Sequence, residues 1–204
     1  MSRIGEQRAV GNGQGHVTGC QDRVALGKRG QFPTDTSYFK GEDCPVENVS
    51  WGDCQAFCAK LSQTTGKPFR LPTEAEWEYA CLAGSATAYF FGNDPKQLSD
   101  YAWYVNNSGN KTHEVCTKKP NAWGLFDMHG NVCEWCQDGY GPYPQGYGRI
   151  NINDPQSGNN GDARVVRGGS WLFAMWSCRA ACRSKFAPGL RTHDQGLRVC
   201  FLLD

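Results

Sequence analysis

From Arg164 onward the chain combines a regular frame with an irregular filling, and this pattern restricts the possible folds more than any other feature. The frame consists of Arg164-Val-Val-Arg-Gly-Gly-Ser-Trp171, Cys178-Arg179, Arg183, Pro188, Arg191 and Gly196-Leu-Arg-Val199. The filling follows neither a helical nor a strand period. It consists of Leu172, Phe173, Ala174, Ser177, Cys182, Ser184, Phe186, Ala187, Leu190, Thr192, His193 and Asp194. Such a frame predicts a rigid surface that presents chosen side chains, either for binding or for catalysis.

The length and charge of the chain argue against several classes of protein. Its 204 residues suit one domain, or one domain with an arm. A net charge of +1 argues against a dedicated nucleic-acid or membrane surface. We expect no membrane span, because the chain contains no run of about 18 apolar residues. No signal peptide is visible, because the first residues lack an apolar core.

The cysteines are expected to be mostly structural. The chain has 11 of them, and Cys133-Glu-Trp-Cys136 is its only C-x2-C pair. A structural zinc site would need a second such pair or a histidine pair at ligand spacing, and the sequence has neither. If residues 133–136 form a strand, the two thiols point to opposite faces, because side chains alternate. We therefore expect most cysteines to act as small buried apolar residues.

Two short helices begin with recognisable caps. Ser50 and Asp53 form a capping-box pattern before apolar residues at helical spacing, which predicts a helix over 51–64. Thr73 and Glu76 repeat the pattern before a second helix over 74–83. β-prone pieces occur at 101–105, 124–126, 131–136, 164–167 and 197–202. We predict an N-terminal arm or extension at 1–36 and one loop-rich α+β domain at 37–204, with small antiparallel sheets.

An ordered series of motifs identifies a family. The motifs are Pro45-Val-Glu-Asn-Val-Ser-Trp51, Phe69-Arg-Leu-Pro-Thr-Glu-Ala-Glu-Trp-Glu-Tyr-Ala80, Phe91-Gly92, Pro120-Asn-Ala-Trp-Gly-Leu-Phe-Asp-Met-His-Gly-Asn-Val132, Glu134-Trp135, Asp154-Pro155 and Arg164–Trp171. Together, over about 38–202, they resemble the formylglycine-generating-enzyme, or sulfatase-modifying-factor, domain. The resemblance implies a C-type-lectin-like fold. It identifies the function less specifically, because one fold hosts many functions.

The same resemblance implies two kinds of metal chemistry. No cofactor is required for binding, but a structural calcium is expected at Asp127, Gly130, Val132 and Glu134; the alternative is that Asp127 caps a turn and Glu134 pairs with an arginine. Catalysis in the family resembles copper-assisted oxidation by two cysteines, since cuprous copper prefers thiolates. The resemblance places the first cysteine at Cys178 and the second at Arg183, which cannot ligate copper. Cys182 lies one position short, so the copper pair is expected to be broken.

The C-terminal region also resembles one branch of this fold, the variable proteins of diversity-generating retroelements. In that branch, adenine-directed mutagenesis rewrites selected codons near the C-terminus, between invariant anchors. The anchors match Gly168–Trp171, Cys178-Arg-Ala-Ala-Cys-Arg183, Pro188, Arg191 and Gly196–Val199 without a gap, with Leu197 replacing the usual Phe. The resemblance implies a variable region at 171–195, in which the irregular residues are the diversified ones.

We therefore predict a non-enzymatic protein that binds a protein or cell-surface ligand. The expected ligand-binding residues are Leu172, Phe173, Ala174, Trp176, Ser177, Cys182, Ser184, Phe186, Ala187, Leu190, Thr192, His193 and Asp194. We expect an exposed apolar cluster of Leu172, Phe173, Phe186 and Leu190, with Phe and Leu as anchors, and a polar rim of Ser184, Thr192, His193 and Asp194, an arrangement typical of protein-binding patches. Arginines 179, 183, 191 and 198 are expected to be scaffold. The alternatives are a copper-dependent oxidase acting on a substrate cysteine, and a purely structural domain. Display on a virion or a cell surface is expected, and the oligomeric state is left open.

Overall fold

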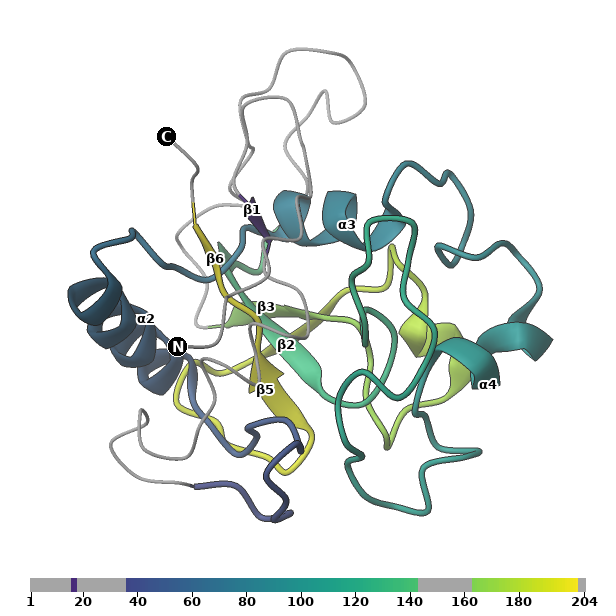
Figure 1. Ribbon diagram of the computed structural model, residues 1–204, viewed down its shortest axis with the longest axis horizontal. Helices are drawn as coiled ribbons and strands as arrows, with labels where there is room; N and C mark the ends of the chain where they lie inside the picture. Colours follow the sequence, from purple (N-terminus) through teal and green to yellow (C-terminus); the bar gives the residue numbers. More distant parts are fainter. Residues whose placement is uncertain (1–15, 18–35, 143–162, 202–204) are drawn as a thin grey trace, which may run out of the picture.

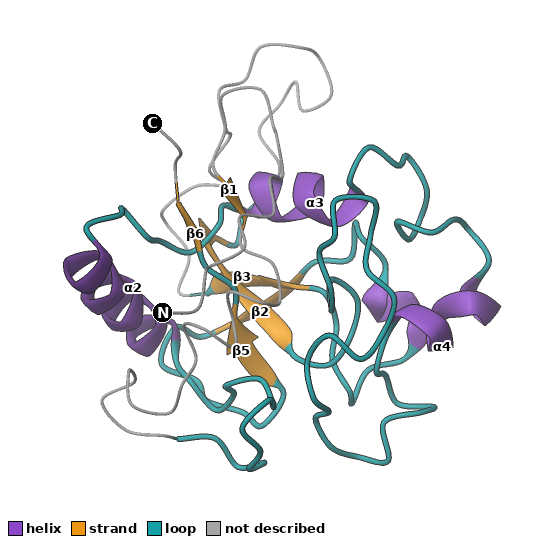
Figure 2. Cartoon of the chain, viewed as in Figure 1, coloured by secondary structure: helices purple, strands orange, loops and turns teal. Residues whose placement is uncertain are grey.

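The chain folds as an α+β domain in which helices surround a small sheet. The computed structural model describes residues 16–17, 36–142 and 163–201. Its elements are β1 (His16–Val17), α2 (Trp51–Thr65), α3 (Glu74–Leu82), η1 (Pro95–Gln97), α4 (Leu98–Tyr101), β2 (Cys133–Gly139), β3 (Arg164–Arg167), η2 (Met175–Cys178), β4 (Ser184–Phe186), β5 (Gln195–Leu197) and β6 (Cys200–Phe201). Figure 1 shows the strands in the middle of the molecule, with α2, α3 and α4 around them. Loops make up much of the remaining trace (Figure 2).

The main sheet has four strands in the order β4-β3-β2-β5. The β2–β3 and β3–β4 pairs are antiparallel, whereas β5 runs parallel to β2. The expectation of purely antiparallel sheets was therefore wrong for one pair, because β5 returns to β2 only after the long excursion through β3 and β4. A second, two-stranded sheet pairs β1 with β6. Most of the predicted arm at 1–36 lies outside the described residues, apart from β1 and Thr36.

The two predicted helices form where their caps place them. Ser50 and Asp53 make a reciprocal capping box at α2, which ends at Gly66 in the left-handed conformation. Thr73 and Glu76 do the same at α3. The short η1–α4 unit was not predicted, although Asp94 caps it and Pro95 stands in its first turn. That pair of residues was the signal available in the sequence.

Strand β2 separates two parts of the core. Cys133 and Trp135 pack into the cluster beneath α2, whereas Cys136 packs into the cluster beneath α3. This confirms that the two thiols of the C-x2-C pair point to opposite faces. Seven of the nine free cysteines in the described residues are buried, as expected for small apolar residues. Cys116 is disulfide-bonded.

Two β-prone pieces did not become strands. Residues 101–105 contain the end of α4 and a single isolated bridge from Trp103 to Gly130. Residues 124–126 form a loop, because the Asn121 side-chain carbonyl accepts the N–H groups of Trp123 and Leu125 and closes a turn. Local side-chain hydrogen bonds thus replaced the strand ladder at this position.

Candidate ligand-binding surface

Three large apolar side chains of the 171–195 region are exposed. Leu172 is 50% exposed, Trp176 63% and Leu190 39%. Ala187 and His193 are exposed as well. These five are the predicted ligand-binding residues that the structure places on the surface. Solvated apolar side chains of this size are typical of interaction sites when they occur together.

The other predicted residues lie deeper. Phe173 and Phe186 are half-buried against the core cluster beneath α2, so they are packing residues more than exposed anchors. Five more are half-buried: Ala174, Ser177, Cys182, Ser184 and Thr192. Asp194 is only 7% exposed, and its carboxylate accepts hydrogen bonds from Ser170 and Thr192. Its assignment to a polar rim was wrong, because these bonds hold it inside.

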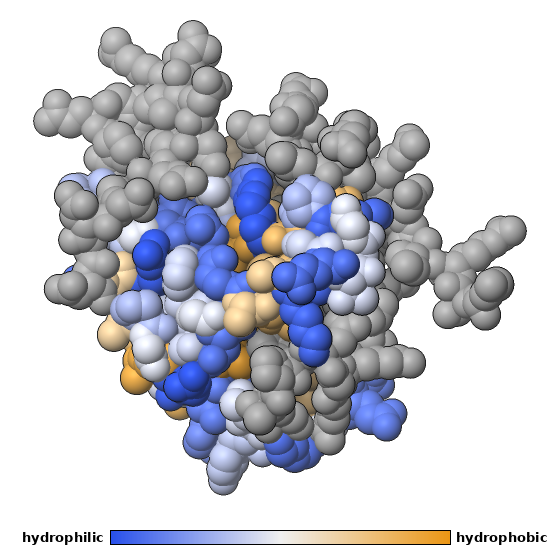
Figure 3. Space-filling model, turned by 90° about the vertical axis from the view of Figure 1, so that its left-hand side faces the viewer, coloured by the Kyte–Doolittle hydropathy of each residue, from blue (hydrophilic) through white to orange (hydrophobic). Residues whose placement is uncertain are grey.

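The face that carries α2 has a different character. Its visible coloured surface is mostly hydrophilic, with smaller hydrophobic areas near the middle and at the lower left (Figure 3). The outward residues of α2 include Ala56, Ala59, Lys60 and Gln63, which are small or polar. None of the large exposed hydrophobic side chains of the described residues lies on α2.

The 171–195 region is attached to the domain largely through its main-chain carbonyls. Val105 N–H donates to the Phe173 carbonyl (3.1 Å), and Asn48 N–H donates to the Thr192 carbonyl (3.0 Å). Arg167 donates to the Cys182 carbonyl (2.7 Å), and Cys133 N–H donates to the Asp194 carbonyl (2.7 Å). The Met175 and Pro188 carbonyls are held by the Tyr89 hydroxyl and by Trp51 N–H. Every residue type has this carbonyl, so these attachments do not depend on the side chain present.

Frame residues, by contrast, are held by their side chains. Arg191 forms an ion pair with Asp53 at the start of α2 (2.8 Å). Arg198 is fully buried and pairs with the buried Glu134 (2.8 Å). The prediction that Arg183, Arg191 and Arg198 are scaffold is confirmed. Arg179 is exposed, and its Nε donates to the Trp176 carbonyl (2.9 Å).

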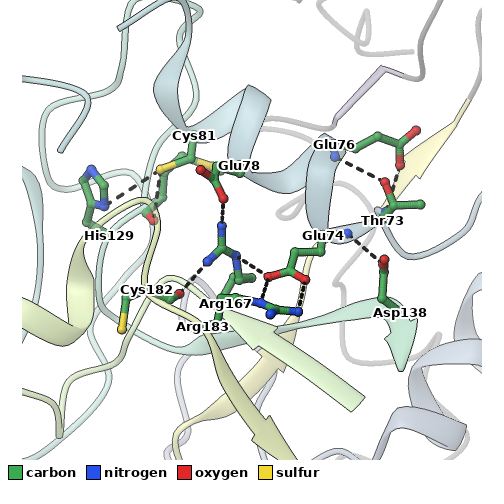
Figure 4. A network of polar contacts seen from close by, with 11 residues as sticks. Thr73, Glu74, Glu76, Glu78, Cys81, His129, Asp138, Arg167, Cys182 and Arg183 are labelled. Atoms are coloured by element: carbon green, nitrogen blue, oxygen red, sulfur yellow. Dashed lines mark hydrogen bonds and ion pairs between the residues drawn. The ribbon is translucent and has the colours of Figure 1, made fainter. Parts of the chain in front are cut away.

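A buried ionic network fixes Arg183 (Figure 4). Its Nε and Nη2 donate to the two carboxylate oxygens of Glu74 at 2.5 and 2.7 Å, and its Nη1 donates to the Gly141 carbonyl. The fully buried Arg167 lies beside the same carboxylate and also pairs with Glu78. Strand β4 begins at the next residue and pairs with β3. Arg183 therefore cannot shift by one residue to let Cys182 take its place without breaking this network.

Cys178 is a buried thiol beneath the Gly168-Gly169 turn. Burial raises the pKa of Cys178 to about 12, so it is protonated at neutral pH. Both glycines have positive φ, and a Cβ on Gly169 would lie 2.7 Å from the Cys178 sulfur. With Arg183 in the second position, the residues do not fit a two-thiolate copper site, because a guanidinium cannot ligate copper.

The expected calcium ligands are committed to other contacts. Both carboxylate oxygens of Glu134 accept hydrogen bonds from Arg198, and one also accepts from Trp77 Nε1. Asp127 accepts the N–H of Cys116, and a Cβ on Gly130 would lie 2.2 Å from the Trp103 carbonyl oxygen. Glu134 thus neutralises a guanidinium, as the alternative to a calcium ligand predicts, and calcium at Asp127, Gly130, Val132 and Glu134 stays a prediction. No cluster of three His, Cys, Asp or Glu side chains suited to a metal occurs within the described ranges.

Two exposed apolar residues near the surface were not predicted. Tyr38 is 62% exposed and stacks on His193, and Val105 is 40% exposed and bonds through its N–H to Phe173. Neither stands in a motif, so the sequence held no signal for them. No helix among residues 36–142 and 163–201 combines the length and apolarity needed to cross a bilayer.

Comparison with known proteins identifies the family of this chain. Residues 9–201 match the family described as the sulfatase-modifying factor enzyme 1-like domain. The formylglycine-generating enzyme of Streptomyces coelicolor is 36% identical over 169 residues, which cover 76% of this chain and 51% of that enzyme. The solved structure of Treponema denticola variable protein 1 is 32% identical with a TM-score of 0.82, covering 87% of this chain and 81% of that one.

A second solved structure, PvdO from Pseudomonas aeruginosa, is 31% identical with a TM-score of 0.72; the match covers 81% of this chain and 65% of that one. Both sequence resemblances, to the enzyme family and to a variable protein, are therefore confirmed, and with them the C-type-lectin-like fold. The chain spans about half the length of the Streptomyces enzyme. The family match begins at residue 9, inside the predicted arm, so the proposed boundary at residue 37 stays a prediction.

Proposed function

The chain belongs to the family of sulfatase-modifying factor enzyme 1-like domains, and we propose that it is a non-enzymatic member that binds a protein or cell-surface ligand through its 171–195 region. The observation that carries this proposal is the division of labour within the region. Frame positions such as Arg183, Arg191 and Arg198 are held by side chains. Positions such as Phe173, Cys182 and Thr192 are attached through main-chain carbonyls. The Phe173 ring also packs against the cluster beneath α2, and the Thr192 hydroxyl also donates to Asp194.

This division suits a surface whose side chains are replaced while its backbone stays in place. Leu172, Trp176 and Leu190 would act as the apolar contacts of this particular sequence. The likeness to Treponema denticola variable protein 1 supports diversification of these positions. Display on a virion or a cell surface is part of the same proposal, because a diversified surface is useful where it meets changing partners.

A copper-dependent oxidase is the second candidate, since a formylglycine-generating enzyme is 36% identical to the chain. Arg183 argues against it, because it stands where the second copper-ligating cysteine would be and is paired with Glu74. The protein would be incubated with copper, oxygen and a Cys-x-Pro-x-Arg peptide. We expect no conversion of the peptide cysteine beyond the amount of protein added. Repeated turnover would refute the binding proposal in its non-enzymatic form.

The binding proposal has its own test. Codons for Leu172, Trp176, Ala187 and Leu190 would be randomised together in the full chain, and the library displayed and selected on lysozyme as a probe protein. Most members should fold, and selection should yield lysozyme binders. A matched library randomised at Arg167, Cys178, Arg183 and Arg198 should mostly fail to fold. Equal folding of the two libraries, or no binders from the first, would count against a replaceable binding surface.

A further inference from the structure

The exposed large apolar side chains of the described residues are concentrated around one region. Six are at least 39% exposed: Tyr38, Tyr79, Val105, Leu172, Trp176 and Leu190. Three of them belong to the 171–195 region. Two more, Tyr38 and Val105, come from other segments but contact it directly. Tyr79, on α3, is the exception.

Tyr38 forms a platform with His193. Their rings stack at 4.2 Å between centroids with an angle of 8° between planes. The neighbouring Phe39 packs edge-on against Trp171 at 5.6 Å. The segment is fixed in this position, because Phe39 N–H donates to Glu47 (2.8 Å) and Asn48 N–H donates to Thr192 (3.0 Å). Tyr38 therefore projects from a rigid loop beside the 171–195 region.

Val105 contacts the same region near its beginning. Its N–H donates to the Phe173 carbonyl, and the nearby Ser108 hydroxyl donates to the Trp171 carbonyl (2.8 Å). The loop after α4 also reaches the Tyr38 segment, since Val115 N–H donates to the Asp43 carbonyl (2.9 Å). Figure 1 shows the segment that precedes α2, the loop after α4 and the loop after β4 at the same end of the molecule.

We propose that Tyr38 and Val105 are fixed ligand contacts that flank the replaceable side chains, and that they take apolar side chains of a protein ligand. The inference rests on the proposed function and extends it beyond the 171–195 region. Polar side chains at this end are already engaged within the domain: Arg191 with Asp53, and Thr192 with Asp194. The large hydrophobic side chains that the region and its two neighbouring segments expose, namely Tyr38, Val105, Leu172, Trp176 and Leu190, suit apolar side chains of a protein better than a sugar or an anion.

The test uses the unaltered full chain and a phage-displayed library of random peptides as the probe. Selected peptides should be rich in aromatic and aliphatic residues. Tyr38→Ala should weaken their binding about tenfold, as for a central aromatic contact, and Val105→Ser should weaken it less. Tyr79→Ala is the matched control, because Tyr79 is a similarly exposed tyrosine on α3. It should change binding less than twofold. Thermal melting of each variant checks that folding is intact.

The outcomes separate this inference from the proposed function. Peptides that tolerate Tyr38→Ala and Val105→Ser but are lost on Leu172→Ala or Leu190→Ala would overturn the inference and leave the proposed function standing. Peptides insensitive to all four changes would overturn both, and so would a selection that yields no binder. A predominance of acidic peptides, or their release by glucose, galactose or mannose, would overturn the assignment to apolar side chains of a protein.

Discussion

Arg183 and Glu74 form a buried two-contact ion pair that joins the start of α3 to the residue before β4. The guanidinium reaches both carboxylate oxygens, at 2.5 and 2.7 Å, and both side chains are nearly inaccessible to solvent. In the family's enzymes, the resemblance places a copper-ligating cysteine at this position. In this chain, the residue at this position instead stabilises the fold by joining α3 to β4.

Replacing Arg183 with cysteine should destabilise the protein without creating an oxidase. The Arg183→Cys change removes both short contacts to the Glu74 carboxylate, and breaking a buried pair typically costs about 3–5 kcal/mol. Urea unfolding should show this loss. Arg179→Cys is the control, because Arg179 is exposed and should cost under about 0.5 kcal/mol. Turnover of a Cys-x-Pro-x-Arg peptide by the Arg183→Cys variant would contradict the structural role.

Gly169→Ala should destabilise the protein by about 1–3 kcal/mol, because Gly169 lies in the tight turn that precedes the 171–195 region. Gly169 has a φ of 69°, and an added Cβ would lie 2.7 Å from the Cys178 sulfur and 3.0 Å from the Ser177 carbonyl oxygen. Thermal melting measures the loss. Gly189→Ala should be nearly neutral, since nothing lies within 4 Å of its added Cβ. Similar melting temperatures for the two variants would show that the turn does not need glycine.

Truncation should separate the exposed from the packed apolar residues of the 171–195 region. Leu172→Ala should change the free energy of unfolding by less than about 0.5 kcal/mol, because Leu172 is half exposed. Phe186→Ala should cost about 2–4 kcal/mol, because its ring packs on the core and lies edge-on to Trp135. Denaturant unfolding of both variants measures these two free-energy changes. A large loss at Leu172 would mean that it is a packing residue instead of a ligand contact.

Stability should fall as the pH drops below about 6.5, because of His129. Burial lowers the pKa of His129 to about 3 from the ordinary value of 6.5. Between pH 6.5 and pH 3, His129 is therefore protonated in the unfolded chain but neutral in the folded chain. The contribution of His129 to stability is complete above pH 6.5 and declines towards pH 3. The slope approaches about 1.4 kcal/mol per pH unit.

Urea unfolding between pH 7.5 and 5 would measure this loss, with the His129 ring followed by NMR. Its resonances should stay those of the neutral imidazole throughout that range. The carboxylate of Glu76 affects stability only at lower pH. Burial alone would raise the pKa of Glu76, but the hydrogen bond from Arg70 outweighs burial and lowers it, so the stability that Glu76 contributes is lost only below pH 4.5. Titration of the folded His129 ring near pH 6 would show that the imidazole is accessible to protons.

Thiol alkylation should distinguish Cys178 from a catalytic thiolate. Burial raises its pKa to about 12, so native Cys178 should react with iodoacetamide far more slowly at pH 7.5 than the half-buried Cys44 and Cys182. Peptide mass spectrometry after timed labelling gives the order. In urea all three should react at similar rates. Rapid native labelling of Cys178 would revive the oxidase candidate.

Sequence patterns predicted the features that depend on local chemistry. The capping boxes at Ser50 and Thr73 determine where α2 and α3 begin, and both helices form there. The spacing of Cys178 and Arg183 indicated a broken copper pair, and Glu74 supplies the reason. One alternative for Glu134 was an ion pair with an arginine, and the structure shows this pair with Arg198.

The sequence could not predict which side chains of the binding surface are buried and which are exposed. Asp194 reads as a polar rim residue, yet two hydroxyl groups hold it inside. Phe186 reads as an exposed anchor, yet Trp135 on β2 lies close enough to receive its ring. Tyr38 joins the surface only because a distant loop folds back beside His193. Each outcome depends on a contact between residues far apart in the chain.

Attachment through the main chain sets a limit of its own on the sequences that the 171–195 region accepts. Some of its N–H groups also donate: Phe173 to Ser170, Ser177 to Ala174, and Leu190 to Ala187. Proline has no N–H and would remove each of these bonds. At the exposed positions of the region, the repertoire open to this fold is therefore broad in the size, charge and polarity of side chains, whereas proline is excluded at the donor positions.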